Sequence, residues 1–127
     1  MTETDLESFV AMAGEAYARL PLPIRQLSKD ILIRVDEFAH EEVLAHLEIT
    51  DPYGLLGLYH GIDLLRKSGF DTVPSQDMIF LYRQPILRFW QAGSDSLERV
   101  IQHVLVHEIG HHFGLSDEDM HGIEEQP

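Results

Sequence analysis

The chain has 127 residues, of which 9 are Lys or Arg and 22 are Asp or Glu, so its formal net charge is −13 with histidine neutral. This acidity argues against a nucleic-acid partner, because phosphate contacts need clustered Lys and Arg, and it disfavours binding to an anionic membrane surface. The lack of cysteine excludes disulfides and Cys-based zinc sites. With neither a leader pattern nor a stretch of about 20 apolar residues, we expect one soluble, cytoplasmic domain over residues 1–127.

The first third of the chain predicts two helices and a strand. Apolar residues at helical spacing predict a helix over residues 5–20, which Pro21 and Pro23 end. The segment ILIRV, residues 31–35, is short and β-branched and therefore predicts a strand. The segment HEEVLAHLE, residues 40–48, predicts a short helix.

The middle of the chain predicts two further strands. Asp51-Pro52 marks a turn before the strand candidate LLGLYHG, residues 55–61, whose two glycines permit close approach by another backbone. Residues 62–77 indicate a connection, and MIFLYR, residues 78–83, predicts the third strand. The following segment, 85–90, opens with proline and is expected to form one or two helical turns.

The best-defined predicted element is a long helix near the C-terminus. Asp95 and Glu98 have the spacing of a capping box, and the run over 97–113 is apolar on most faces, which is typical of a buried helix. Gly114 suits a left-handed C-cap. The acidic segment 115–127 is expected to hold one short helical turn.

The end of this helix carries the motif HExxHxxGxxD. His107 and His111 lie one turn apart, with ~5–6 Å between their Cβ atoms, so their imidazoles can reach one metal ion. Glu108 is rotated by about 100° from His107 and can reach a water molecule on that metal. Gly114 lets the chain leave the helix abruptly, and Asp117 can return a carboxylate as the third ligand. Two imidazoles and one carboxylate suit Zn²⁺ and leave a fourth position for water.

An alternative interpretation of this motif needs no metal. His107 and His111 could be core histidines that backbone carbonyls satisfy, and Glu108 could be an ordinary surface carboxylate. Burying two histidines and a carboxylate unpaired in an apolar helix would be costly, however, and a metal ion removes that cost. The motif therefore favours one zinc ion.

The other histidines have weaker claims to the site. His103 lies one turn before His107, where it could line the site, meet solvent or serve as an alternative ligand. His112 points away from His111, which favours structural hydrogen bonding, and His121 competes with Asp117 as third ligand. For the scattered residues His40 and His46, the expectation is exposure at the surface.

The run HEIGHHFGLSDEDM, together with LLGLYHGI and DMIFLYRQPI, resembles a family of short bacterial zinc metallopeptidases of the minimal zincin type. The similarity covers roughly residues 5–123. The extended motif also resembles the metzincin pattern in which aspartate replaces the usual third histidine.

The resemblance implies a compact α+β zincin-like fold, in which a small mixed sheet of about three strands packs against an active-site helix and further helices. Carried onto this sequence, it implies His107, His111 and Asp117 as the metal ligands of one Zn²⁺ ion and Glu108 as the general base. The expected activity is metallopeptidase hydrolysis, in which a zinc-activated water attacks a bond of a peptide or protein substrate.

Other functions remain open at this point. A chain of 127 residues has little material for a second wall of the cleft. It could instead be a non-catalytic metal-binding or peptide-interaction module, acting with an unidentified protein partner, or it could hydrolyse a non-peptide amide. As an enzyme it could bind its substrate as an added strand along 55–61, although that segment could equally be an ordinary core strand. Tyr59, His60 and Tyr82 are potential oxyanion donors, but side chains of this kind on strands more often pack.

Overall fold

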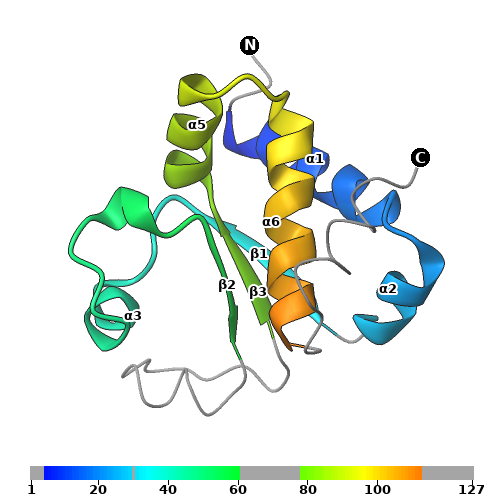
Figure 1. Ribbon diagram of the computed structural model, residues 1–127, viewed down its shortest axis with the longest axis horizontal. Helices are drawn as coiled ribbons and strands as arrows, with labels where there is room; N and C mark the ends of the chain where they lie inside the picture. Colours follow the sequence, from blue (N-terminus) through cyan, green and yellow to red (C-terminus); the bar gives the residue numbers. More distant parts are fainter. Residues whose placement is uncertain (1–4, 30, 61–77, 113–127) are drawn as a thin grey trace.

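The computed structural model describes residues 5–29, 31–60 and 78–112 (Figure 1). The elements in these ranges are α1 (Leu6–Ala18), α2 (Leu22–Leu27), β1 (Leu32–Asp36), α3 (Glu41–His46), the 3-10 turn η1 (Pro52–Gly54), β2 (Gly57–His60), β3 (Met78–Tyr82), α5 (Arg83–Ala92) and α6 (Leu97–His112). Three predictions lie outside the described residues: the connection over 62–77, the C-cap at Gly114 and the tail over 115–127.

The three described strands form one mixed sheet in the order β1-β3-β2. β1 runs parallel to β3, with Ile33 opposite Ile79, whereas β2 runs antiparallel to β3, with Tyr59 also opposite Ile79. Helices and this small sheet together make an α+β fold, as predicted. Among the described strands, β2 therefore lies at one edge of the sheet.

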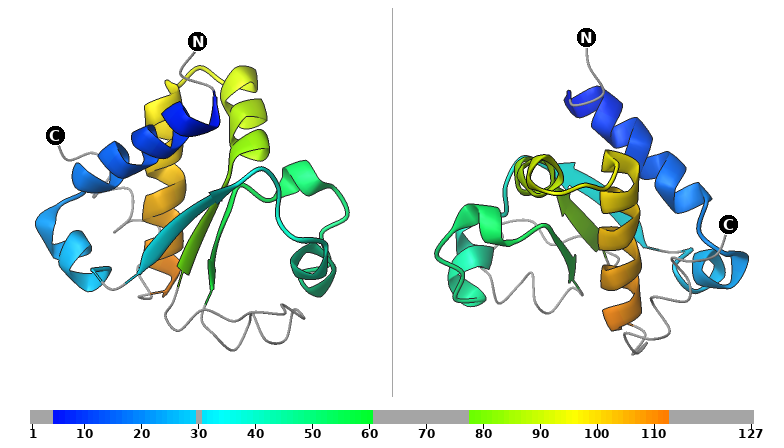
Figure 2. Two further views of the ribbon diagram at one scale, coloured as in Figure 1. Left: turned by 180° about the vertical axis from the view of Figure 1, so that it is seen from behind. Right: turned by 45° about the horizontal axis from the view of Figure 1, so that its top comes forward.

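Helices cover both faces of the sheet because successive β3 side chains point to opposite sides. Ile79 and Leu81 belong to the larger hydrophobic cluster, which contains the buried residues of α1 and α6. Phe80 and Tyr82 belong to a second cluster with Val43 and other residues around α3. In Figure 2, α1 and α6 accordingly lie on one side of the sheet and α3 on the other.

Helix α6 forms the centre of the larger cluster. Its buried apolar residues lie on most sides of the helix: Leu97, Val100, Ile101, Val104, Leu105, Val106 and Ile109. This confirms the prediction of a buried helix. The sequence predicted Asp95 as the N-cap of this helix, but the cap is Ser96, whose Oγ accepts a hydrogen bond from the Arg99 amide at 3.2 Å. Asp95 lies 4.0 Å from the Arg99 side chain instead. Ser96 has the short hydroxyl side chain that an N-cap favours.

Two helices near prolines differ from the prediction. Pro21 and Pro23 do end α1, but they also begin α2, with Pro21 as the N-cap and Pro23 in the first turn. α5 starts at Arg83 and has ten residues, so it is longer than the expected one or two turns. Proline is compatible with the first turn of a helix because the amides there have no intrahelical acceptor.

The remaining predicted elements are confirmed, with ends that differ from the prediction by one or two residues. The helix over 5–20 is α1, which Asp5 caps by accepting a bond from the Ser8 amide at 2.8 Å. The helix over 40–48 is α3, and the turn at Asp51-Pro52 is η1, where Asp51 accepts a bond from the Tyr53 amide at 3.0 Å. None of the described helices has the length and apolarity needed to cross a bilayer.

Candidate active site

Two residues of the HExxH motif are described with their side chains, His107 and Glu108. Both are partly exposed and lie near the C-terminal end of α6. The helix continues without interruption to His112, so the backbone of His111 lies one turn after that of His107. The side chain of His111 and the whole of Asp117 lie outside the described residues.

Glu108 is held by the backbone of strand β2. Its Oε1 atom accepts a hydrogen bond from the Tyr59 amide at 3.0 Å, across 49 positions of the chain. A backbone N–H gives a carboxylate a charge-assisted hydrogen bond, which is stronger than one between neutral groups. The carboxylate therefore lies beside the strand rather than in open solvent.

The strand pairing explains why the Tyr59 amide is turned away from the rest of the sheet. In an antiparallel pair, alternate residues direct both backbone groups toward the partner strand. The Tyr82 amide bonds the Leu56 carbonyl at 2.9 Å, which fixes this alternation. Leu58 therefore faces β3 with its backbone groups, while Gly57 and Tyr59 direct theirs outward. Glu108 thus contacts the outer edge of β2.

Gly57 allows β2 to lie close to α6. A Cβ atom at this position would lie 2.5 Å from Val104 Cγ1 and 3.1 Å from the Phe80 carbonyl oxygen. It would also lie 3.6 Å from Glu108 Cγ. The closest neighbour at Gly57 is thus the Val104 side chain, and the predicted approach of another chain's backbone to this glycine stays a prediction. Gly61 is outside the described residues.

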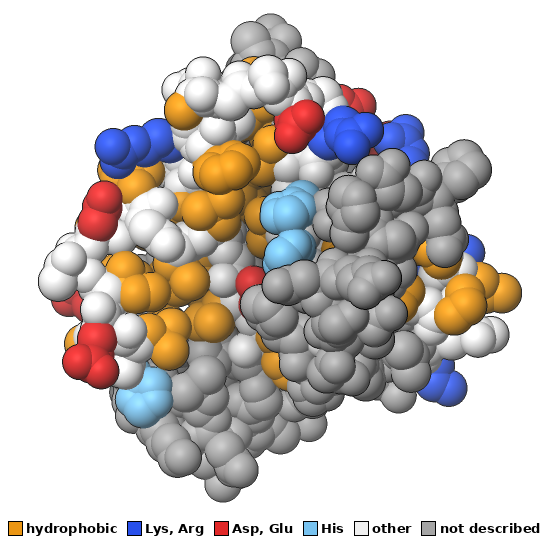
Figure 3. All heavy atoms as spheres, in the orientation of Figure 1, with side chains coloured by type: hydrophobic (Ala, Val, Ile, Leu, Met, Phe, Trp, Pro, Cys, Tyr) orange, Lys and Arg blue, Asp and Glu red, His pale blue; other side chains and the backbone are white. Residues whose placement is uncertain are grey.

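His103 and His107 lie next to each other on the accessible side of α6. Their ring centroids are 4.1 Å apart with an interplanar angle of 46°. Figure 3 shows a pair of histidine side chains at the surface over this helix, with hydrophobic side chains beside them. His103 is exposed, in agreement with the expectation that it could meet solvent. The expected exposure of His40 and His46 is also observed.

Tyr82 belongs to the core rather than to the site. It is only 2% exposed and its ring stacks on Phe80 at 6.2 Å between centroids. Burial, reinforced by the nearby Asp36 and Glu108 carboxylates, raises the pKa of Tyr82 well above its usual range. The hydroxyl consequently stays protonated, and the packing role expected for it holds.

The described part of the motif supplies one potential zinc ligand, His107. Within the residues that the structure describes, no group of three His, Cys, Asp or Glu side chains could hold a metal, and only one of the three predicted ligands has a described side chain. His107 offers an imidazole on the accessible side of α6, and the unbroken helix carries a second histidine one turn later. Imidazole nitrogens at this spacing are suitable zinc ligands.

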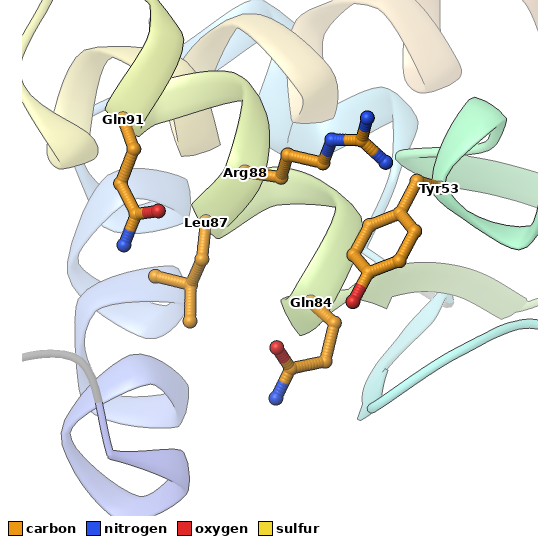
Figure 4. Close-up of a pocket in the computed structure, with 5 residues that line it drawn as sticks. All are labelled: Tyr53, Gln84, Leu87, Arg88 and Gln91. Carbon is orange, nitrogen blue, oxygen red and sulfur yellow. The ribbon is translucent and has the colours of Figure 1, made fainter.

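A separate cavity lies where η1 meets α5. It has a volume of about 360 Å³ and is lined by Tyr53, Gln84, Leu87, Arg88 and Gln91 (Figure 4). The Arg88 guanidinium lies 4.7 Å from the centre of the Tyr53 ring, a cation–π geometry. This contact joins α5 to η1, which directly precedes β2 in the chain.

Sequence reasoning missed the Tyr59 amide as a contact of Glu108. Every residue except proline has a backbone N–H, so the sequence does not show which amide donates to a given carboxylate. The available signal was indirect. The glycine at position 57 indicated a close approach, but not which element approached it.

The sequence of the chain matches a known protein family. The profile of the zincin-like metallopeptidase family matches residues 28–126, which include β1, the sheet, α6 and the complete motif. A comparison with curated proteins gives no significant match. The match extends over most of the chain, and on this basis the chain belongs to the zincin-like metallopeptidase family.

Proposed function

We propose that the protein is a zinc-dependent metallopeptidase that hydrolyses peptide bonds with Glu108 as the general base. One observation carries the proposal: the Glu108 carboxylate lies at the outer edge of β2, on the same helix as His107 and directly beside it in sequence. Membership of the zincin-like metallopeptidase family supports the same activity. A base, a metal-ligand helix and a strand edge thus meet in one place.

His107, His111 and Asp117 would hold the ion. Bound zinc would lower the pKa of a water molecule toward ~7 and polarise a carbonyl group. Glu108 takes the proton from the attacking water and passes it to the leaving amine. The hydrogen bond from the Tyr59 amide keeps the Glu108 carboxylate beside β2 during these transfers.

Strand β2 offers a place for a peptide substrate. Gly57 directs its N–H and C=O away from β3, so an extended peptide can align antiparallel to β2. Such a peptide passes Glu108, because that carboxylate bonds the next outward-facing residue, Tyr59. This arrangement favours peptides over small amides, which have no backbone to pair with the strand.

The test is the substitution Glu108→Gln. Glutamine keeps an oxygen acceptor for the Tyr59 amide but cannot act as a base, so hydrolysis of a cleaved library peptide should fall by about 10²–10⁴-fold. Zinc content and peptide binding should not change. The matched control is Glu98→Gln, an exposed position in the first turn of the same helix, which should keep full activity.

Two results would contradict this function. Unchanged hydrolysis in Glu108→Gln would exclude Glu108 as the base. Peptide binding with no cleavage by zinc-loaded wild-type protein across a broad library would favour a non-catalytic peptide-interaction module.

A further inference from the structure

Gly57 of β2 lies against Val104 of α6. The missing side chain at position 57 leaves room for Val104 Cγ1, which a Cβ atom would approach to 2.5 Å. Real Cβ contacts are essentially never this short, so any larger residue at this position requires a shift of the strand, the helix or the Val104 side chain. Gly57 and Val104 are both buried, which limits the space for such a shift.

Val104 lies one helical turn before Glu108, so both side chains face the same part of β2. A Cβ atom at Gly57 would lie 3.6 Å from Glu108 Cγ, and two residues later the Tyr59 amide bonds Glu108 Oε1. The distance between β2 and α6 is therefore coupled to this 3.0 Å hydrogen bond. A displacement of about 1 Å would break it, because the bond weakens steeply beyond about 3.5 Å.

We propose that Gly57 is a positioning residue: its lack of a side chain brings β2 close enough to α6 for the Tyr59 amide to fix the Glu108 carboxylate. The inference builds on the proposed function, in which Glu108 is the base. It adds that the strand, and not only the helix, determines where this base lies. Val104 is the nearer of the two neighbours that favour glycine at position 57, and the Phe80 carbonyl oxygen, 3.1 Å from such a Cβ atom, is the other.

The experiment compares the full-length variants Gly57→Ala, Val104→Ala and the double variant Gly57→Ala/Val104→Ala. The control is Gly54→Ala, because a Cβ atom at Gly54 meets only Ile49 Cγ2 at an ordinary 3.6 Å. Amide hydrogen exchange by NMR on metal-free protein gives the first measurement, and kcat and KM on a cleaved peptide give the second. The Tyr82 amide, which bonds Leu56 of β2, reports whether β2 stays paired with β3.

In Gly57→Ala, exchange of the Tyr59 amide should accelerate by about tenfold or more relative to the Tyr82 amide. kcat should fall by up to about 100-fold with KM and zinc affinity little changed, since small misplacement of a catalytic group has effects of this size. In the double variant, Tyr59 exchange should return to within about threefold of Val104→Ala, because the truncated side chain removes the 2.5 Å approach. The 3.1 Å approach to the Phe80 carbonyl oxygen remains, and a shift of a few tenths of an ångström relieves it. Gly54→Ala should behave as wild type.

A purely structural role for Gly57 predicts a different pattern. Tyr59 and Tyr82 exchange would then accelerate equally, and this result would overturn the proposal, as would Tyr59 exchange in Gly57→Ala equal to that in Gly54→Ala. If Gly57→Ala fails to fold, folding restored in the double variant supports the contact with Val104, and failure of both variants contradicts it. The exchange measurement needs no substrate, so its result is separate from a failure to observe peptide hydrolysis.

Discussion

At the scale of single residues, the carboxylates of this acidic chain differ in the hydrogen-bond donors that contact them. Glu108 accepts a backbone amide, whereas Glu37 at the end of β1 accepts several side-chain donors. Arg83 Nε lies 2.9 Å from Glu37 Oε2 and Arg83 Nη2 lies 2.9 Å from Oε1, while Gln84 Nε2 lies 2.8 Å from Oε1. These contacts join the end of β1 to the start of α5.

Glu37 gives a pH-dependent contribution to stability. The hydrogen bonds from Arg83 are the largest cause of a Glu37 pKa below its usual value of 4.5, with burial opposing them. Because the carboxyl group is more acidic in the folded state, its contribution is present above the unfolded pKa and is lost as pH falls through the folded pKa. Glu37→Gln should therefore flatten the fall in unfolding free energy between about pH 5 and pH 3.

Urea unfolding at several pH values checks this prediction. At neutral pH, Glu37→Gln should cost about 1 kcal/mol or less, because solvent screens a carboxylate that is 44% exposed. The matched control is Glu15→Gln, whose partner Arg19 lies 3.6 Å away with both side chains more than 60% exposed. Glu15→Gln should change neither the pH dependence of the unfolding free energy nor its value at neutral pH appreciably. Parallel pH profiles for wild type and Glu37→Gln would contradict the role of the Arg83 contact.

At the scale of elements, the end of α3 shows how a helix stops without glycine. Glu48 has a φ of 60°, the left-handed region that side chains disfavour. Its amide bonds the Ala45 carbonyl at 3.1 Å, and the Ile49 amide bonds the Leu44 carbonyl at 2.9 Å. These two bonds form a Schellman motif, which closes the helix and keeps Ile49 in the cluster around α3.

Glu48→Gly should stabilise the protein. Glycine removes a left-handed strain of about 1–2 kcal/mol and loses part of that gain through extra freedom in the unfolded chain, leaving roughly 0.5–1 kcal/mol. Thermal unfolding should show a melting temperature higher by a few degrees. Glu48→Ala is the control, since alanine keeps the Cβ atom and should give no such gain. A lower melting temperature in Glu48→Gly would show that the Glu48 side chain contributes more than its backbone strain costs.

Elements with strong local signals were predictable from the sequence. The apolar pattern over 97–113 located α6, because helix formation there depends on residues within a few turns. The start of α5 was not predictable, because the Gln84 amide bonds the Glu37 carbonyl at 3.2 Å, a contact with a residue far away in sequence. α2 was missed because Pro21 and Pro23 indicate both the end of one helix and the start of another.

At the scale of the whole molecule, the three-stranded sheet and the helices on both faces place the site. α6 packs against α1 and against β2 and β3 on one face of the sheet (Figure 1), so Glu108 lies next to the edge of β2. Three short strand patterns predicted the strands, and the family resemblance implied that they form a small mixed sheet. Its order, β1-β3-β2, was not predictable, because strand order depends on long-range pairing rather than on local sequence.

In the candidate site, helical spacing predicts that His107, Glu108 and His111 come together, and the exit from the helix at Gly114 predicts Asp117 beside them. These roles stay predictions, whereas the contact of the Tyr59 amide with Glu108 required the observed fold. The identity of a residue does not show where its backbone amide points. The orientation of the Tyr59 amide follows from the pairing of β2 with β3. The fold thus adds to the motif a strand that holds Glu108.

The most direct test is the zinc content of the full chain, measured by elemental analysis on protein purified without a metal-affinity tag. We expect about one zinc ion per chain in the wild type and none in the double variant His107→Ala/His111→Ala, which should remain folded. Folded wild-type protein that takes up no zinc when the ion is supplied, or a double variant that keeps its zinc, would contradict the zinc site on which the proposed hydrolysis depends.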